Sequence, residues 1–233
     1  MFPNFKKTFF VLAFILISSS TAKALTIIQV SLGGQGNGFQ EIQYVGSALS
    51  TINDGDGATI GDQDTNVIFD NLLSSVADIA SGASFTLSGI SANGAPSVAG
   101  PVISQDTVGG TFSLFDNANT LLLSGNLSDG VLVGSDNGSV ASTFSTTFGN
   151  FNGGTLLPLI PNLNTLFLAL TLSNVQTAGA SGLDVAFGII QNFSGNGQIS
   201  IDAELAATPE PFTLGLLFTG TLMGAFISRR KLS

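Results

Sequence analysis

Two long segments of this chain alternate strictly between apolar and polar or small residues. In 166–173 four leucines occupy every second position, and in 199–205 Ile, Ile, Ala and Leu alternate with Ser, Asp and Glu. An alternation of period two puts the apolar side chains on one face of a β-strand. Both segments are therefore predicted to be strands with one buried face.

Shorter segments with strand-forming residues fill most of the chain between residues 25 and 207. They are separated by turn dipeptides such as Asn93-Gly94 and Asp129-Gly130. Many short strands at this spacing predict an all-β fold, either an antiparallel β-sandwich or a jelly-roll-like domain. The further candidate strands are 26–31, 39–45, 84–91, 110–116, 120–128, 130–135 and 139–148.

One segment, 66–79, departs from this pattern. Its residues Ile68, Leu72, Val76 and Ile79 fall at helical spacing, which predicts one short helix. The alternative is a pair of irregular strands, because a run of Val, Ile and Phe at the start of the segment also suits a strand.

The charges are divided between the ends of the chain and its middle. Residues 25–208 contain no Lys, Arg or His, yet they hold 14 of the 15 acidic residues. Nucleic acids are bound through Lys and Arg that neutralise phosphates, so this composition excludes a nucleic-acid partner. It also disfavours anionic membrane surfaces. The stretch is expected to attract cations.

The N-terminus has the three parts of a secretory signal peptide. Lys6 and Lys7 precede an apolar run over 9–17, and Ala22 and Ala24 form a small-x-small cleavage site. Cleavage after Ala24 predicts export, with a Sec-type machinery as partner, and a mature domain over 25–207. A retained membrane anchor is the alternative, but the apolar run is only about half the roughly 20 residues that a span needs.

The C-terminus has the features of a membrane-inserted tail. The run 212–228 carries no charge and would reach about 25 Å as a helix. We therefore predict a C-terminal transmembrane helix there, followed by a basic tail over 229–233. Pro209-Glu210-Pro211 holds the preceding chain extended, because proline fixes its own φ and disfavours helix for its predecessor. The basic residues would stay cytoplasmic and stop transfer; they are Arg229, Arg230 and Lys231.

In this order, the Pro-Glu-Pro motif, the apolar run and the basic tail over 208–233 resemble the PEP-CTERM sorting signal of exported bacterial proteins. The resemblance implies recognition and cleavage by a membrane-embedded exosortase. It also implies an inner-membrane intermediate, a final place on the cell surface or in the extracellular matrix, and an association with exopolysaccharide production. A plain C-terminal membrane anchor is the alternative interpretation of the same residues.

Acidic residues concentrate in one glycine-rich segment. Calcium takes six to eight oxygen ligands from carboxylates, carbonyls and water, which predicts a calcium loop here. The alternative is that Asp, Asn and Gly are present only because they form loops. The candidate ligands are Asp54, Asp56, Asp62, Asp64 and Asn66.

The missing residue types restrict catalysis. Without His, Cys, Lys or Arg, residues 25–207 cannot form a Ser-His triad, a Schiff base or an arginine clamp. Carboxylates alone remain, which is the chemistry of glycosidases. We therefore expect a non-enzymatic structural or adhesive protein, whose partners are exopolysaccharide or further copies of the chain. A polysaccharide-binding module is the second hypothesis, and a secreted glycosidase is the third.

Overall fold

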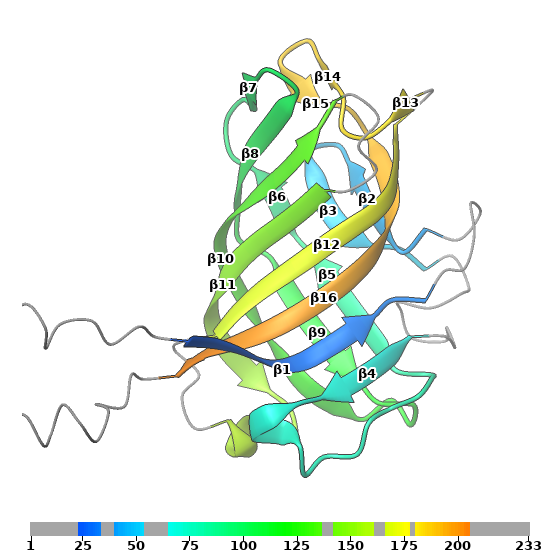
Figure 1. Ribbon diagram of the computed structural model, residues 1–233, viewed down its shortest axis with the longest axis vertical. Helices are drawn as coiled ribbons and strands as arrows, with labels where there is room; N and C mark the ends of the chain where they lie inside the picture. Colours follow the sequence, from blue (N-terminus) through cyan, green and yellow to red (C-terminus); the bar gives the residue numbers. More distant parts are fainter. Residues whose placement is uncertain are drawn as a thin grey trace, which may run out of the picture. The chain divides into compact units, whose positions relative to one another are not determined.

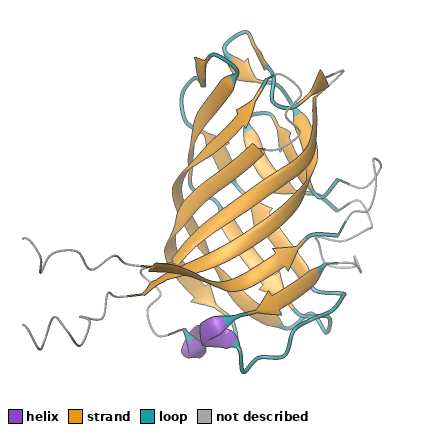
Figure 2. Cartoon of the chain, in the orientation of Figure 1, coloured by secondary structure: helices purple, strands orange, loops and turns teal. Residues whose placement is uncertain are grey.

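The computed structural model describes residues 23–33, 40–53, 65–136, 142–160, 166–177 and 180–205, excluding the side chains of 23, 180, 204 and 205 (Figures 1 and 2). Residues 24–204 form one compact unit. Figure 2 shows that strands make up nearly all of the compact unit. The prediction of an all-β fold is confirmed.

In the described ranges, sixteen strands and two short 3-10 turns follow one another. The turns are η1 (Asn71–Leu73) and η2 (Leu157–Leu159). The strands are β1 (Lys23–Ser31), β2 (Ile42–Val45), β3 (Ala48–Thr51), β4 (Asn66–Phe69), β5 (Ser84–Ser88), β6 (Ile90–Ala92), β7 (Ser97–Ala99), β8 (Val102–Val108), β9 (Thr111–Phe115), β10 (Leu121–Ser135), β11 (Ser142–Gly153), β12 (Leu166–Thr177), β13 (Ala180–Ser181), β14 (Val185–Ala186), β15 (Ile189–Ile190) and β16 (Phe193–Leu205).

The main sheet closes into an antiparallel barrel of eight strands. Its order is β12-β11-β10-β8-β6-β3-β2-β16, and β16 pairs again with β12 to complete the circle. Figure 1 shows these strands winding obliquely around the barrel. The predicted β-sandwich is therefore wrong, because the sheet closes on itself. Both architectures bury one face of every strand, so the alternation of residues does not distinguish them.

Two long strands divide the barrel wall into two parts. β10 pairs with β9 through residues 121–126 and with β8 through 130–135. β16 likewise neighbours both β2 and β1. The ring part of the wall is β8-β6-β3-β2, and the seam part consists of the pairs β9–β5 and β1–β4.

The barrel interior is mostly apolar. All four alternating leucines of β12 are buried, and Leu168 and Leu170 lie opposite Ile201 and Ile199 of β16. An aromatic cluster of Phe85, Phe112, Phe148 and Phe151 fills the interior beside β5 and β9, with Phe112 in contact with the other three rings. Burying each such side chain stabilises the fold by about 1.5–3 kcal/mol.

The predicted helix over 66–79 is wrong. Its first residues form β4, where Val67 and Phe69 are buried and Ile68 is 42% exposed, which is the period of a strand. The chain then turns back through η1, and Val67 and Ile79 exchange backbone hydrogen bonds of 2.8 and 2.9 Å. The carboxylate of Asp78 also accepts the amide N–H of Phe69 at 2.8 Å. Strand formation by the β-branched residues thus prevails over the helical spacing.

Part of the predicted organisation lies outside the described residues. This applies to the PEP motif 209–211, the transmembrane segment 212–228 and the basic tail, and to all but the end of the predicted signal peptide 1–24. Among the residues that the structure describes, no helix is long and apolar enough to cross a membrane.

Candidate binding groove

The residues that the sequence singled out are not brought together in the described structure. Asn66 lies in β4, opposite Ser31, with a half-buried side chain. Within the described ranges, no three His, Cys, Asp or Glu residues form a group that could hold a metal ion. Ala24 is exposed at the start of β1. The remaining predicted site residues lie outside the described residues: Ala22, Asp54, Asp56, Asp62, Asp64, Pro209, Glu210, Pro211, Arg229, Arg230 and Lys231.

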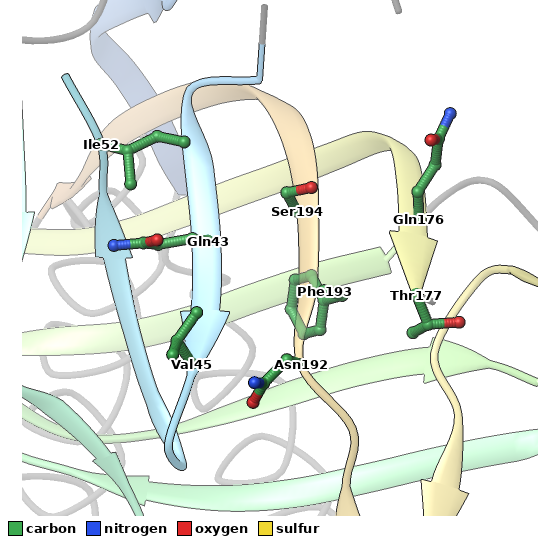
Figure 3. A pocket seen from close by; sticks show the side chains of 8 residues that line it. All are labelled: Gln43, Val45, Ile52, Gln176, Thr177, Asn192, Phe193 and Ser194. Atoms are coloured by element: carbon green, nitrogen blue, oxygen red, sulfur yellow. The ribbon is translucent and has the colours of Figure 1, made fainter. Parts of the chain in front are cut away.

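A groove of about 500 Å³ lies where β2, β16 and β12 run side by side. Figure 3 shows its side chains coming from these three strands, from the residue that follows β3 and from the residue that precedes β16. None of the lining residues is ionisable: they are Gln43, Val45, Ile52, Gln176, Thr177, Asn192, Phe193 and Ser194.

The register of the strands aligns serine and glutamine residues in one row. Ser194 is the partner of Gln43 on one side and of Gln176 on the other. Gln43 in turn lies opposite Ser50, and Gln176 lies opposite Ser181. This serine–glutamine row therefore crosses β3, β2, β16, β12 and β13. At the usual strand spacing it is about 19 Å long.

The row faces outward because its neighbours in sequence face inward. Phe193 and Tyr44 are buried and stack with ring centroids 5.3 Å apart. Adjacent residues of a strand point to opposite faces, so Ser194 and Gln43 lie on the outer wall. Burial raises the pKa of Tyr44, and a side-chain hydrogen bond with Ser47 only partly offsets this effect. The stacked pair is thus a neutral, apolar support beneath the groove.

Existing hydrogen bonds hold the groove's polar groups in position. Gln43 Nε2 donates to Ser50 Oγ at 3.2 Å, and the Ser194 hydroxyl donates to the Gln40 side-chain oxygen. Asn192 Oδ1 accepts the amide N–H of Gly46 at 3.2 Å, which ties the start of β16 to the turn after β2. An amide has two N–H donors and two acceptor lone pairs, so these bonds use only part of its capacity.

These groups can hold a ligand but are poorly suited to proton transfer. Amides and aliphatic hydroxyls do not titrate near neutral pH, whereas general acids and bases need a pKa near the working pH. The arrangement of the groove can therefore hold a ligand through hydrogen bonds.

A second surface feature is an apolar end beside the groove. Val98 and Val102 of the β7–β8 hairpin are 54% and 46% exposed, and Phe187 and Ile189 of the β14–β15 hairpin are 102% and 52% exposed. Figure 1 shows both hairpins at the same end of the barrel. Phe187 has a φ of 56°, a conformation that is unfavourable for a bulky residue.

A third feature is a closed ring of asparagine amides on β10 and β11. Asn126 donates to Asn150 at 2.7 Å, Asn150 to Asn152 at 3.0 Å, and Asn152 to Asn126 at 3.2 Å. Each side-chain amide therefore donates one hydrogen bond and accepts one within the ring. The ring is a cross-strand contact that stabilises the pairing of β10 with β11.

Comparisons with known proteins return no match: no protein-family model, no curated protein and no solved structure is similar to this chain.

Sequence reasoning missed the groove because its residues are ordinary within each strand. Gln43 lies inside a predicted strand, whereas Gln176 and Ser194 lie just beyond predicted strand ends. Their relation exists only in the register of β2, β16 and β12. One signal in the sequence could have indicated an outward-facing polar residue here. In β2, inward and outward residues alternate, and Gln43 precedes the inward-facing Tyr44.

Proposed function

We propose that this chain is an exported, non-enzymatic protein of the bacterial cell surface or extracellular matrix, with a structural or adhesive role. In this proposal residues 1–24 direct export through a Sec-type machinery, and 208–233 act as the sorting signal that an exosortase recognises at Pro209-Glu210-Pro211. The PEP-CTERM resemblance of the C-terminal residues supports this route. After processing, the released domain carries no basic side chain, since every Lys and Arg lies at the two ends of the chain.

The observation that carries the adhesive role is the uncharged groove on the outer wall. It is lined by amides, hydroxyls and aliphatic groups, which bind without performing acid–base chemistry. The described carboxyl group with a lowered pKa, Asp116, has a local explanation. It accepts the backbone N–H of Thr120 at 2.7 Å and of Ala118 at 2.8 Å, and these bonds favour its charged form. Asp116 therefore stabilises the turn between β9 and β10.

Intact mass spectrometry of the protein extracted from the cell surface tests the proposed processing. We expect a mass that lacks the first 24 residues and the segment beyond the PEP motif. Replacing Pro209 and Pro211 by Ala should leave a membrane-held form with an uncleaved C-terminus, because the extended segment presented to the protease would be lost. A protein recovered in the cytoplasm with both ends intact would contradict the proposal.

The adhesive role is tested separately, by measuring cell aggregation and attachment to surfaces. Cells that lack the gene are expected to aggregate and attach to surfaces less than cells complemented with the unaltered gene. Complementation with the Pro209→Ala, Pro211→Ala variant should fail to restore attachment, whereas an unprocessed variant that restores it fully would contradict the role of sorting.

A further inference from the structure

We infer that the serine–glutamine row is a binding site for a neutral, hydroxyl-rich carbohydrate chain. The inference rests on the proposed adhesive function and names the class of ligand that its groove takes. The row is Ser50, Gln43, Ser194, Gln176 and Ser181 across five neighbouring strands.

The charge distribution selects a neutral ligand. No residue that lines the groove is ionisable, and residues 25–208 hold 14 acidic but no basic side chains. An anionic ligand would meet an overall negative field with no counter-charge. A cationic ligand would find no carboxylate in the groove to replace its hydration, and burying an unpaired charge is costly.

The hydrogen-bonding groups match a polyol. A hydroxyl both donates and accepts, and a primary amide has donors and acceptors side by side, so each can bond adjacent hydroxyls of a sugar. Gln43 and Gln176 flank Ser194 on its two neighbouring strands, about 4.8 Å away on each side. The hydroxyl of Ser194 and the amide of Gln43 are already oriented by Gln40 and Ser50. The row is therefore organised before a ligand arrives, which lowers the entropy lost on binding.

The apolar part of the groove determines how the carbohydrate chain is held. Val45 and Ile52 offer aliphatic surface to the C–H groups of sugar rings. Phe193 is buried against Tyr44, so its ring is not an exposed stacking platform. Binding thus depends on hydrogen bonds repeated along the row. Gln43, Gln176 and Ser194 line the groove, and the two end serines extend the row beyond it. A row of about 19 Å suits an extended oligosaccharide better than a single sugar.

A peptide fits this surface less well. Extended peptides usually add to the free edge of a sheet, where their backbone completes the hydrogen-bond ladder. The serine–glutamine row instead crosses the face of the sheet, and at Gln43, Ser194 and Gln176 the strands are paired on both sides.

The test uses the mature protein extracted from the cell surface. Neutral hexasaccharides of glucose, mannose and galactose are titrated by calorimetry, beside a galacturonate hexasaccharide and a Gly-Ser hexapeptide. We expect saturable binding of at least one neutral hexasaccharide, with affinity that falls as the chain is shortened to a disaccharide. The uronate and the peptide should not bind.

Two substitutions locate the site. The Gln43→Ala, Gln176→Ala double variant should bind the neutral hexasaccharide about tenfold more weakly or worse, the loss of two or more hydrogen bonds. Gln198→Ala is the matched control, because Gln198 is exposed on β16 opposite Thr171 and outside the groove. Its affinity should equal that of the unaltered protein. If the double variant melts earlier, Gln176→Ala alone, at an exposed position, gives the same comparison with a smaller loss.

Three results would overturn the inference: no neutral hexasaccharide binds the folded protein, the groove variants bind as tightly as Gln198→Ala, or the uronate or peptide is preferred. A protein that reaches the cell surface but does not bind removes this inference alone. A protein that stays in the cytoplasm removes the proposed function and, because the inference rests on it, the inference as well.

Discussion

The ring and seam parts of the barrel wall close by different means. In the ring part, β8, β6, β3 and β2 are joined by backbone hydrogen bonds from one strand to the next. In the seam part, the described strands β4 and β5 do not pair with each other. Two individual hydrogen bonds connect the chain around these strands instead. The amide of Ala83, just before β5, donates to the carbonyl of Thr65, just before β4, at 3.2 Å. The amide of Leu87 in β5 donates to Thr51 Oγ1 in β3 at 3.1 Å. The second of these contacts is made by a side chain in place of a backbone carbonyl, so the seam should be more sensitive to side-chain substitution.

The largest effect is expected from the aromatic cluster that packs behind the seam. Phe112→Ala removes the ring that contacts Phe85, Phe148 and Phe151 and should lower the free energy of unfolding by about 3–5 kcal/mol. Urea denaturation measures this loss. Phe187→Ala is the control, because its fully exposed ring buries no surface. Equal losses for the two variants would show that the cluster does not support the seam.

A smaller effect is expected from the side chain that bridges β3 and β5. Thr51→Val keeps the shape but leaves the Leu87 amide without its Oγ1 acceptor, which should cost about 1–3 kcal/mol. Hydrogen exchange should become faster at Leu87 and its neighbours, while amides of β12 keep their protection. Thr143→Val is the matched control, since Thr143 is exposed on β11, opposite Thr171. Unchanged exchange at Leu87 would mean that the seam closes without Thr51.

The smallest effect concerns the turn that leads from the seam into β10. Hydrogen bonds from Thr120 and Ala118 lower the pKa of Asp116, so its stabilising contribution is present above the ordinary carboxyl pKa. The contribution is lost as the pH falls through the lowered value. In the Asp116→Ala variant, the free energy of unfolding should therefore depend slightly less on pH at acidic pH. An NMR titration that gives Asp116 an ordinary or raised pKa would contradict this account.

Strand formation was predictable in the long strands β12 and β16, whose apolar residues alternate over many positions. β12 and β16 keep their apolar residues inward, and both were predicted from alternation alone. β8 was missed because two of its inward residues, Gln105 and Thr107, are polar and buried. Gln105 Nε2 contacts the carbonyl oxygens of Asn93, Gly94 and Asp106, so its burial is compensated by hydrogen bonds that a sequence pattern does not reveal.

The predicted turn at Asp129-Gly130 shows a second limit. These residues lie inside β10, at a register shift where the strand changes partners from β9 to β8. A Cβ at position 130 would lie 2.6 Å from the carbonyl oxygen of Ser145, so only glycine permits this approach. Glycine marks both turns and bulges, and the choice between them depends on the neighbouring strand.

Neither the closure of the barrel nor the groove could be predicted from the sequence, and the reason is the same for both. Each depends on β16 pairing with β12 along one side and with β2 along the other. The contacts between β16 and β2 join residues more than a hundred positions apart, such as Gln43 and Ser194. Alternation tells which face a residue occupies, but it does not tell which strand lies beside it.

Cross-strand NMR contacts in the purified protein show whether the barrel is closed. In a closed barrel we expect backbone contacts from Ser194 both to Gln43 and to Gln176, because β16 closes the ring between β2 and β12. A well-dispersed spectrum in which Ser194 contacts only one of these residues would contradict the closed barrel, and with it the serine–glutamine row.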